Sequence, residues 1–341
     1  MVAAPPFPQK LGVPKANLVN PVDPVFLETC SRIALYSSRS ARLAEEKSSS
    51  QAAFVGGYKM QRLSLAAALI VVLWGFVQSA SAQSAPSRDG VEIRYSAVGS
   101  GEPALVFIHG GFVDRTYWAS QLSAFSKDHR VIALDLAGHG ESGSDRKNWT
   151  LELFGADVCA VMQKEKVGRA VLIGNSMGGP VALEAARQAP GRVVGVIGID
   201  TFQNFTEPNP PSGVEERAKA FRENPSGTMK AMIRMLLHKD TDPALIARIE
   251  QDMTNVSGEF AAAVTLCFSG YDYKRAVKEA KVPVRAINGD LFPTEVQKNR
   301  SVAGSFEAVI LPHVGHYPML ETPELFNRVL AGLLTEWKKS R

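Results

Sequence analysis

A serine lies at the apex of a tight turn between a predicted strand and a predicted helix. The apolar residues 170–173 lead into Gly-Asn-Ser-Met-Gly-Gly, and a helical pattern continues from residue 177 to about residue 189. The spacing G-x-S-x-G at such a turn is typical of a nucleophilic serine whose hydroxyl is exposed. We expect Gly174 and Gly178 to lie where a β-carbon would clash with the neighbouring strand or helix. Ser176 is therefore the predicted nucleophile.

Attack on a carbonyl group also requires donors for the negative charge that develops on its oxygen. The helix after Ser176 directs its positive end and the Met177 amide to that position. The second amide is expected in the glycine-rich turn His109-Gly-Gly-Phe112, which follows the apolar run 104–108. Gly111 is the first choice for this donor and Phe112 the second.

A serine hydroxyl is a poor nucleophile until a base removes its proton. The base is usually a histidine whose tautomer is fixed by a carboxylate. Two histidines, His313 and His316, follow the last predicted strand. His316 is the predicted base because Gly315 gives its loop the freedom to bring the ring over the serine. His313 is then a loop residue near the rim of the site.

Two carboxylates are candidates for the residue that orients the histidine. Asp290 directly follows the predicted strand 284–288, and Asp200 ends the predicted strand 193–200. Either could reach the imidazole. The sequence favours Asp290, which follows the strand immediately before His316. Asp200 remains the alternative acid, and its other interpretation is a carboxylate that fixes a loop or lines the pocket.

Strands and helices alternate along most of the chain. This order predicts a parallel sheet with helices on both faces. An early strand with period two is expected to pair antiparallel, and the apolar runs are expected to be buried on both faces. The further predicted strands and helices are residues 90–98, 131–135, 151–164, 307–311 and 322–339.

One segment interrupts the alternation. Residues from about 204 to 282 contain no convincing strand pattern. Helical patterns instead occur at residues 213–223, 228–238, 243–253 and 258–269. We predict a helical cap inserted between two core strands, over the crevice where open α/β sheets bind ligands.

The first 82 residues differ in composition from the rest. Residues 1–59 are rich in proline, serine and small residues, which predicts disorder. Residues 60–82 combine a basic start, an apolar run and Ala-Ser-Ala, the pattern of a secretory signal peptide. We expect Met60 to be the true start, with residues 1–59 not translated, and the alternative is a membrane anchor. The mature domain is then 83–341, exported or periplasmic and without stable membrane association.

Composition excludes several function classes. The formal net charge of +4 arises within the first 82 residues, which carry eight Lys and Arg against four Asp and Glu, so no nucleic-acid partner is expected. The six histidines form no metal-ligand spacing, and we predict no metal site and no cofactor. Cys159 and Cys267 are predicted to be buried thiols. Oligomeric state has no signal in the sequence.

The chain from about residue 91 to residue 337 resembles the α/β-hydrolase superfamily. The stretches that carry the resemblance, in the expected order, are 107–112, 134–142, Gly174-Asn-Ser-Met-Gly-Gly179, and Gly289-Asp290 followed by Gly315-His316. The resemblance implies an eight-stranded, mostly parallel sheet, a lid and a triad of Ser176, Asp290 and His316. Pro293 follows Asp290 sooner than in many relatives, and this shorter loop keeps Asp200 as an alternative.

The residue type at the turn narrows the reaction class. Serine at this position excludes the superfamily branches that use aspartate, such as epoxide hydrolases and haloalkane dehalogenases. The resemblance therefore implies acyl transfer to water, with carboxylic esters as the commonest substrates. The Gly-Asn-Ser-Met-Gly-Gly form is also similar to that of enzymes that hydrolyse C–C bonds in diketones. A third possibility is a homologue that binds a small ligand or signals without turnover. The expected partner is a small acyl substrate.

Overall fold

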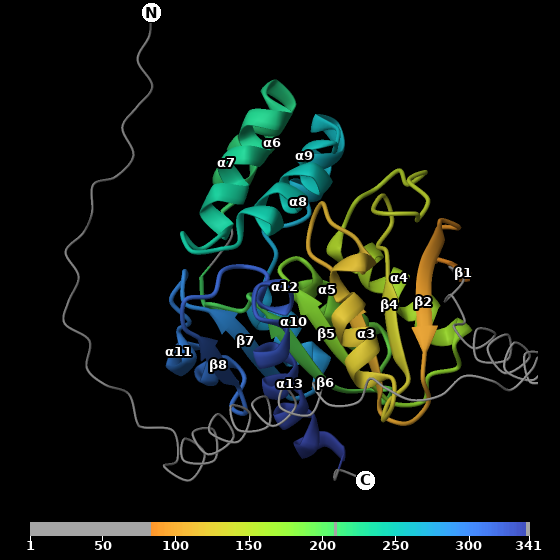
Figure 1. Cartoon of the computed structure of the whole chain (residues 1–341). Coiled ribbons are helices and arrows are strands. Elements are labelled where there is room, and N and C mark those ends of the chain that lie inside the picture. The colour runs from red at the N-terminus through yellow and green to blue at the C-terminus, as the bar shows by residue number, and fades with distance from the viewer. Residues whose placement is uncertain (1–82, 208–209, 339–341) are drawn as a thin grey trace, which may run out of the picture. The chain divides into compact units, whose positions relative to one another are not determined.

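The computed structural model describes residues 83–207 and 210–338 of the chain (Figure 1). The disorder predicted for residues 1–59 and the signal peptide predicted for residues 60–82 lie outside the described residues. Among the helices that are described, none is both long and apolar enough to cross a membrane.

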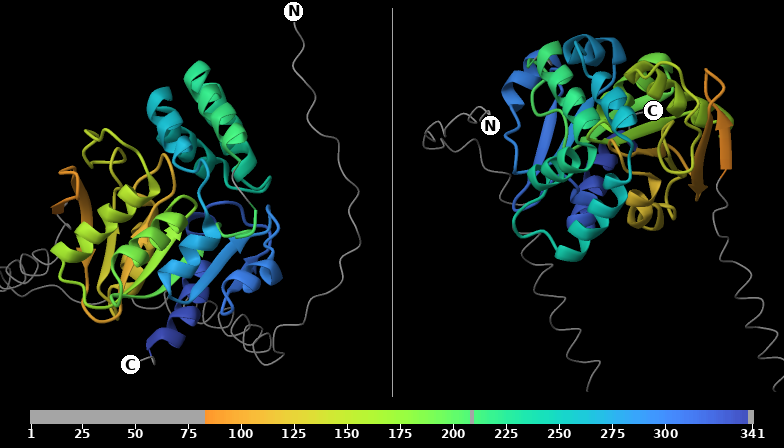
Figure 2. Two further views of the ribbon diagram at one scale, coloured as in Figure 1. Left: turned by 180° about the vertical axis from the view of Figure 1, so that it is seen from behind. Right: turned by 90° about the horizontal axis from the view of Figure 1, so that it is seen from above.

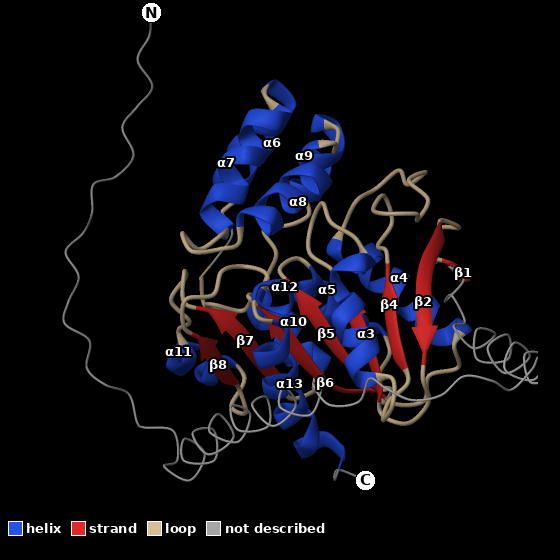
Figure 3. Ribbon diagram, in the orientation of Figure 1, coloured by secondary structure: helices blue, strands red, loops and turns tan. Residues whose placement is uncertain are grey.

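An eight-stranded, mostly parallel sheet forms the centre of the described chain (Figure 3). Its strand order is β1-β2-β4-β3-β5-β6-β7-β8, and only β1 and β2 pair antiparallel with their neighbours. This confirms the predicted α/β-hydrolase fold. The strands are β1 (Gln83–Pro86), β2 (Glu92–Val98), β3 (Ala104–Ile108), β4 (Val131–Leu134), β5 (Ala170–Asn175), β6 (Val193–Ile199), β7 (Val284–Gly289) and β8 (Glu307–Leu311).

The central strands are buried along their whole length. Every residue of β3, β4 and β5 is buried, whereas β2 near the edge begins with alternating exposed and buried residues. The continuous apolar runs of the sequence are explained by helices on both faces of the sheet. The carboxyl ends of the parallel strands therefore meet at one edge of a rigid core.

Helices cover the two faces of the sheet (Figure 2). On one face α4, α5 and α10 pack together, and on the other α3 contacts α13. Thr150 caps the N-terminus of α4, because its hydroxyl accepts the Leu153 amide at 3.1 Å. The helices outside the cap are η1 (Arg115–Trp118), α3 (Ala119–Phe125), α4 (Leu151–Lys164), α5 (Gly178–Gln188), α10 (Tyr273–Ala280), α11 (Val296–Val302), α12 (Pro318–Glu321) and α13 (Pro323–Lys338).

Four helices stand above the strand ends between β6 and β7, and we call them the cap (Figure 1). Three begin with a proline, which suits the first turn because that turn leaves its N–H groups unpaired. The sequence predicts a cap that extends to residue 282, but α10 packs on α5 and belongs to the core layer. Just before α10, the Tyr271 hydroxyl donates to Glu184 of α5 at 3.1 Å. The cap helices are α6 (Pro211–Glu223), α7 (Pro225–Leu236), α8 (Pro243–Thr254) and α9 (Gly258–Leu266).

A buried ion pair joins the loop after β4 to helix α4. Arg146 Nη2 lies 2.6 Å from Asp157 Oδ1, and both side chains are 0% exposed. The Ser87 hydroxyl also donates to Asp157 Oδ1 at 2.5 Å, and the Ala137 amide donates to Oδ2 at 3.1 Å. Burial raises the pKa of the Asp157 carboxyl, and Arg146 opposes that rise. Arg146 Nε also lies 2.7 Å from Asp89 Oδ2, so Arg146 holds two carboxylates, of which Asp157 is the fully buried one.

Removing one member should leave the other charge buried and unpaired. We expect Arg146→Met to lower the free energy of unfolding by about 3–5 kcal/mol. The loss should be smaller at pH 5 than at pH 8, because the Asp157 pKa is raised in the folded protein and a protonated carboxyl needs no cation. Urea denaturation at both pH values measures this. In the control, Arg222→Met removes the exposed pair with Glu259 and should cost at most about 1 kcal/mol. Equal losses in the two variants would contradict the interpretation.

Candidate active site

Ser176 lies between the end of β5 and the start of α5, at a backbone φ of 52°. Left-handed backbone is unfavourable for a serine and occurs often at functional sites. A β-carbon on Gly174 would lie 2.1 Å from the Gly178 carbonyl oxygen, and one on Gly178 would lie 2.5 Å from the Ile108 carbonyl oxygen. Both predicted glycine constraints are confirmed. The turn can therefore form only with glycines on both sides of the serine.

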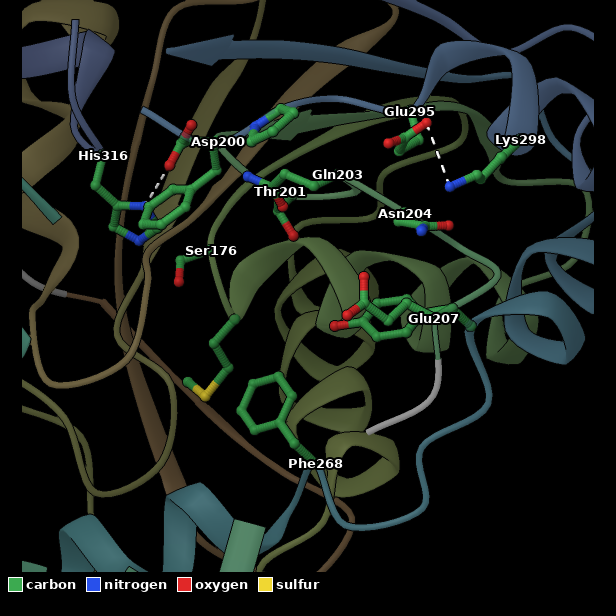
Figure 4. A pocket seen from close by; sticks show the side chains of 14 residues that line it. Ser176, Asp200, Thr201, Gln203, Asn204, Glu207, Phe268, Glu295, Lys298 and His316 are labelled. Atoms are coloured by element: carbon green, nitrogen blue, oxygen red, sulfur yellow. Dashed lines mark hydrogen bonds and ion pairs between the residues drawn. The ribbon is translucent and has the colours of Figure 1, made fainter. Parts of the chain in front are cut away.

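His316 is paired with Asp200 (Figure 4). Its Nδ1 lies 2.5 Å from Asp200 Oδ2, and the side chains are 9% and 1% exposed. The second carboxylate oxygen, Oδ1, accepts the Gly289 amide at 3.0 Å. With Asp200 ionised, Nδ1 carries the proton and Nε2 is left as the proton acceptor. Ser176, Asp200 and His316 line the same pocket, so the predicted nucleophile and base lie together with the alternative acid.

Asp290, the acid that the sequence favours, occupies a different position. Its carboxylate accepts the backbone amide of His313 at 2.9 Å, and its side chain is exposed. That hydrogen bond lowers the pKa of Asp290. Asp290 therefore fixes the loop that carries His316 and does not orient the imidazole. The preference for Asp290 is a wrong prediction on this geometry, and the alternative, Asp200, takes its place.

The order of strands in the sheet explains why Asp200, and not Asp290, contacts His316. β6 lies directly beside β5, whereas β7 is one strand further away. The end of β6 therefore lies beside the turn of Ser176, whose amide donates to the Ile199 carbonyl at 3.0 Å. At Asp200 the backbone enters left-handed space, with φ at 43°. Both acids follow a parallel strand, so their positions along the chain do not distinguish them.

Hydrogen bonds to the backbone at and beside His316 fix the position of this residue. Its amide donates to the Leu236 carbonyl at the end of α7 at 2.8 Å, and its carbonyl accepts Asn175 Nδ2 at 3.0 Å. Glu321 accepts the amides of both flanking residues, Gly315 and Tyr317, each at 3.0 Å. Sequence reasoning missed Glu321. Its signal was a carboxylate five residues after the histidine, at the end of the short helix that begins with Pro318.

The two predicted donors for a carbonyl oxygen lie on one side of Ser176. Gly111 and Met177 line a pocket together with Ser176, and Phe112 follows in the same wall. Phe112 adopts a φ of 66°, so the chain bends sharply directly after Gly111. This arrangement is compatible with either amide of the turn as second donor, and the choice of Gly111 stays a prediction.

Two pockets meet at Ser176, Met177 and Phe268. The first, which we call the polar pocket, has a volume of about 550 Å³ and is drawn in Figure 4. The second, the apolar pocket, has a volume of about 190 Å³ and lies beneath the cap. Besides the shared residues, the polar pocket is lined by Gln203, Asn204, Glu207, Tyr273, Phe292, Glu295, Lys298 and His316, among others. The apolar pocket is lined mostly by apolar side chains and by one charged side chain, Arg217; the apolar ones include Phe112, Phe221, Met232, Leu236, Met253, Val264 and Tyr317.

Other titratable groups of the core are unsuited to the chemistry. Burial lowers the pKa of His109, and it lowers the pKa of His139 to about 3, so both imidazoles are neutral at pH 7. Burial raises the pKa of the Cys159 thiol to about 11 and that of the Cys267 thiol to about 12. Both cysteines are free and neither is a thiolate at neutral pH. Ser176 therefore remains the candidate nucleophile.

Comparison with known proteins gives the same fold. A family model described as "Alpha/beta hydrolase family" matches residues 105–329. An acetyltransferase component of the acetoin cleaving system of Cupriavidus necator is 35% identical over 122 residues, which cover 36% of this chain and only 33% of that protein. A 2-hydroxy-6-oxononadienedioate/2-hydroxy-6-oxononatrienedioate hydrolase of Burkholderia vietnamiensis is 28% identical, covering 72% of this chain and 93% of the relative.

The fold also matches solved structures. A thermophilic esterase from Thermogutta terrifontis, with malate bound, superposes with a TM-score of 0.66 at 26% identity. The match covers 75% of this chain and 99% of the esterase. The chain thus shares the fold of nearly the whole esterase, and a quarter of its own length lies outside the match.

The acid assignment gives a direct test of the site. We expect Asp200→Asn to lower the rate at which an organophosphonate labels Ser176 by about 10⁴-fold, because the amide favours the wrong tautomer of His316. Asp290→Asn should have a much smaller effect, since its carboxylate contacts only backbone amide groups of the loop. Mass spectrometry of the labelled protein over time measures both rates. The reverse ranking would return the acid role to Asp290.

Glu321 should act as a positioning residue for His316. A Glu321→Gln side chain can accept only one of the two flanking amides and turns its NH₂ group toward the other. We expect the labelling rate of Ser176 to fall by about tenfold or more, the effect of losing a hydrogen bond to a charged group. Glu324→Gln, on an exposed position of the next helix, should leave the rate unchanged. A lowered melting temperature with an unchanged labelling rate would assign Glu321 to stability alone.

Proposed function

Because the chain belongs to the alpha/beta hydrolase family, we propose that it is a serine hydrolase that cleaves carboxylic esters through Ser176, His316 and Asp200. The observation that carries this proposal is the 2.5 Å pairing of His316 Nδ1 with the buried Asp200 carboxylate, in the pocket that Ser176 also lines. Such a pairing fixes the tautomer that a serine needs in order to lose its proton. The esterase from Thermogutta terrifontis supports the substrate class.

The geometry supports a two-step reaction. As the ester binds, His316 Nε2 takes the proton from Ser176 Oγ, and the oxygen attacks the carbonyl carbon. The carbonyl oxygen becomes an anion that the Met177 and Gly111 amides stabilise. His316 then returns the proton to the alcohol oxygen as the C–O bond breaks, which leaves an acyl-serine. Water attacks that ester with His316 as base, and the acid and free Ser176 are released.

C–C bond hydrolysis is the second candidate function. The similarity to the Burkholderia vietnamiensis hydrolase favours this function, and the substrates in the name of that enzyme are dicarboxylates. Arg217, an exposed cation that lines the apolar pocket, could meet one carboxylate. Against it, the polar pocket carries Glu207 and Glu295 with the single Lys298, and this excess of negative charge disfavours a second carboxylate. Ester hydrolysis is therefore the better supported function.

Covalent labelling tests the proposed nucleophile. An organophosphonate should modify Ser176 and stop the hydrolysis of nitrophenyl esters, because only a serine with a paired base is reactive. Ser176→Ala should remove nearly all turnover and keep the fold, leaving a rate over water on the order of 10³-fold from the amide donors. Ser123→Ala, an exposed serine on α3, is the matched control and should keep full activity.

Two results would contradict the proposal. Full activity in Ser176→Ala, or a label on another serine, would end the assignment of Ser176. Tight retention of a small ligand without turnover would favour the binding function that the sequence leaves open.

A further inference from the structure

We infer that the substrate is an ester of a compact apolar acid with a polar alcohol that carries no negative charge. The acyl group lies in the apolar pocket and the alcohol in the polar pocket, with the ester bond over Ser176. This inference rests on the proposed ester hydrolysis and deepens it. It follows from which groups line each pocket.

The position of the base decides which pocket receives the alcohol. His316 lines the polar pocket, whereas the predicted oxyanion donor Gly111 lines the apolar one. His316 must protonate the alcohol oxygen as it leaves, so this oxygen must point toward the imidazole. The carbonyl oxygen must point toward the amides of Gly111 and Met177. The acyl chain then continues beneath the cap, on the side away from His316.

The apolar pocket sets the size of the acyl group. Its volume of about 190 Å³ is lined by side chains from all four cap helices, among them Phe221, Met232, Met253 and Val264. An apolar cavity of about 150 Å³ accommodates a benzene molecule. The pocket is therefore suited to an acyl group of about six carbon atoms, either a short chain or one aromatic ring.

The polar pocket selects the alcohol by charge and by aromatic contact. Lys298 Nζ lies 3.5 Å from Glu295 Oε2, so its charge is largely matched, and Glu207 adds a second carboxylate. Phe268, Tyr273 and Phe292 also line this pocket. Aromatic faces and carboxylates attract cations and repel anions. An alcohol with a hydroxyl or ammonium group fits this pocket, and a sulfonate or carboxylate does not.

Met232 gives a test of the acyl arm. We expect nitrophenyl esters from acetate to dodecanoate to reach their highest kcat/KM near six acyl carbons. Met232→Ala enlarges the apolar pocket and should move the optimum to longer chains, with little change in the rate on acetate. Met235→Ala is the matched control on the same helix, because Met235 is 65% exposed and lies outside the pocket. An optimum that does not move in Met232→Ala would overturn the acyl assignment.

Three butyrate esters of similar size test the alcohol arm. Their alcohols are choline, 3,3-dimethylbutanol and 3-hydroxypropanesulfonate, which differ in charge. We expect kcat/KM to fall in that order by about two- to five-fold per step, the effect of one partly exposed charge pair. The differences should shrink at high salt. The fastest turnover on the sulfonate ester would overturn the alcohol assignment.

Glu295→Gln separates the charge of the pocket from its shape. It frees Lys298, and we expect it to raise kcat/KM for the sulfonate ester by about two- to five-fold. Glu216→Gln, an exposed cap position outside both pockets, should leave kcat/KM for all three esters unchanged. An identical response of the two variants would contradict a selective role for the polar pocket.

The failure of the inference differs from the failure of the proposed function. Suppose that hydrolysis depends on Ser176 and that Met232→Ala changes only the preference for the alcohol. The acyl group and the alcohol would then occupy the opposite pockets, and the proposed serine hydrolase activity would still hold. Absence of any ester hydrolysis that depends on Ser176 would overturn both.

Discussion

The close approach of the first turn of α5 to the central strands is the constraint on which the site depends. At Gly178 the helix comes so near to β3 that a β-carbon would lie 2.5 Å from the Ile108 carbonyl oxygen. The contact joins two segments that are some seventy residues apart in the chain. It places Ser176 above β5 and, in the same step, brings the turn of Gly111 beside it. The nucleophile and its predicted amide donors are therefore positioned by one packing contact.

The side chain of Asn175 connects the turn of Ser176 to the segments that carry Asp200 and His316. Its side-chain Nδ2 donates to the Ile199 carbonyl and to the His316 carbonyl, each at 3.0 Å. Ile199 precedes Asp200, so one amide group joins the turn of Ser176 to the loops of the acid and the base. The three proposed catalytic residues follow three strands of the sheet, and the buried Asn175 side chain bonds to the backbone of two of their loops. The sheet core and these hydrogen bonds therefore position the three side chains, as an active site requires.

Local patterns predicted most of the fold and two of the three residues that we propose as the triad. The apolar runs and helical periods gave the strands and the cap helices, because burial on one or both faces leaves a repeat in the sequence. Ser176 and His316 were predictable because each lies in a short segment with its own glycines. Asp200 and Asp290 were ranked wrongly, since the choice depends on β6 lying next to β5 in space. Glu321 was missed because its role is to bind backbone amides, which leave no pattern in side-chain types.

The cap is hydrogen-bonded to the segment that carries His316 and Glu321. The end of α7 accepts the His316 amide at the Leu236 carbonyl, and a β-carbon on Gly315 would lie 2.8 Å from that same oxygen. The Thr241 hydroxyl, in the connection between α7 and α8, donates to Glu321 at 3.0 Å. Leu236 also lines the apolar pocket. The end of α7, which lines the apolar pocket, is thus hydrogen-bonded to the loop that carries His316. Two hydrogen bonds, one at Leu236 and one at Thr241, therefore join the cap to the loop of the proposed base.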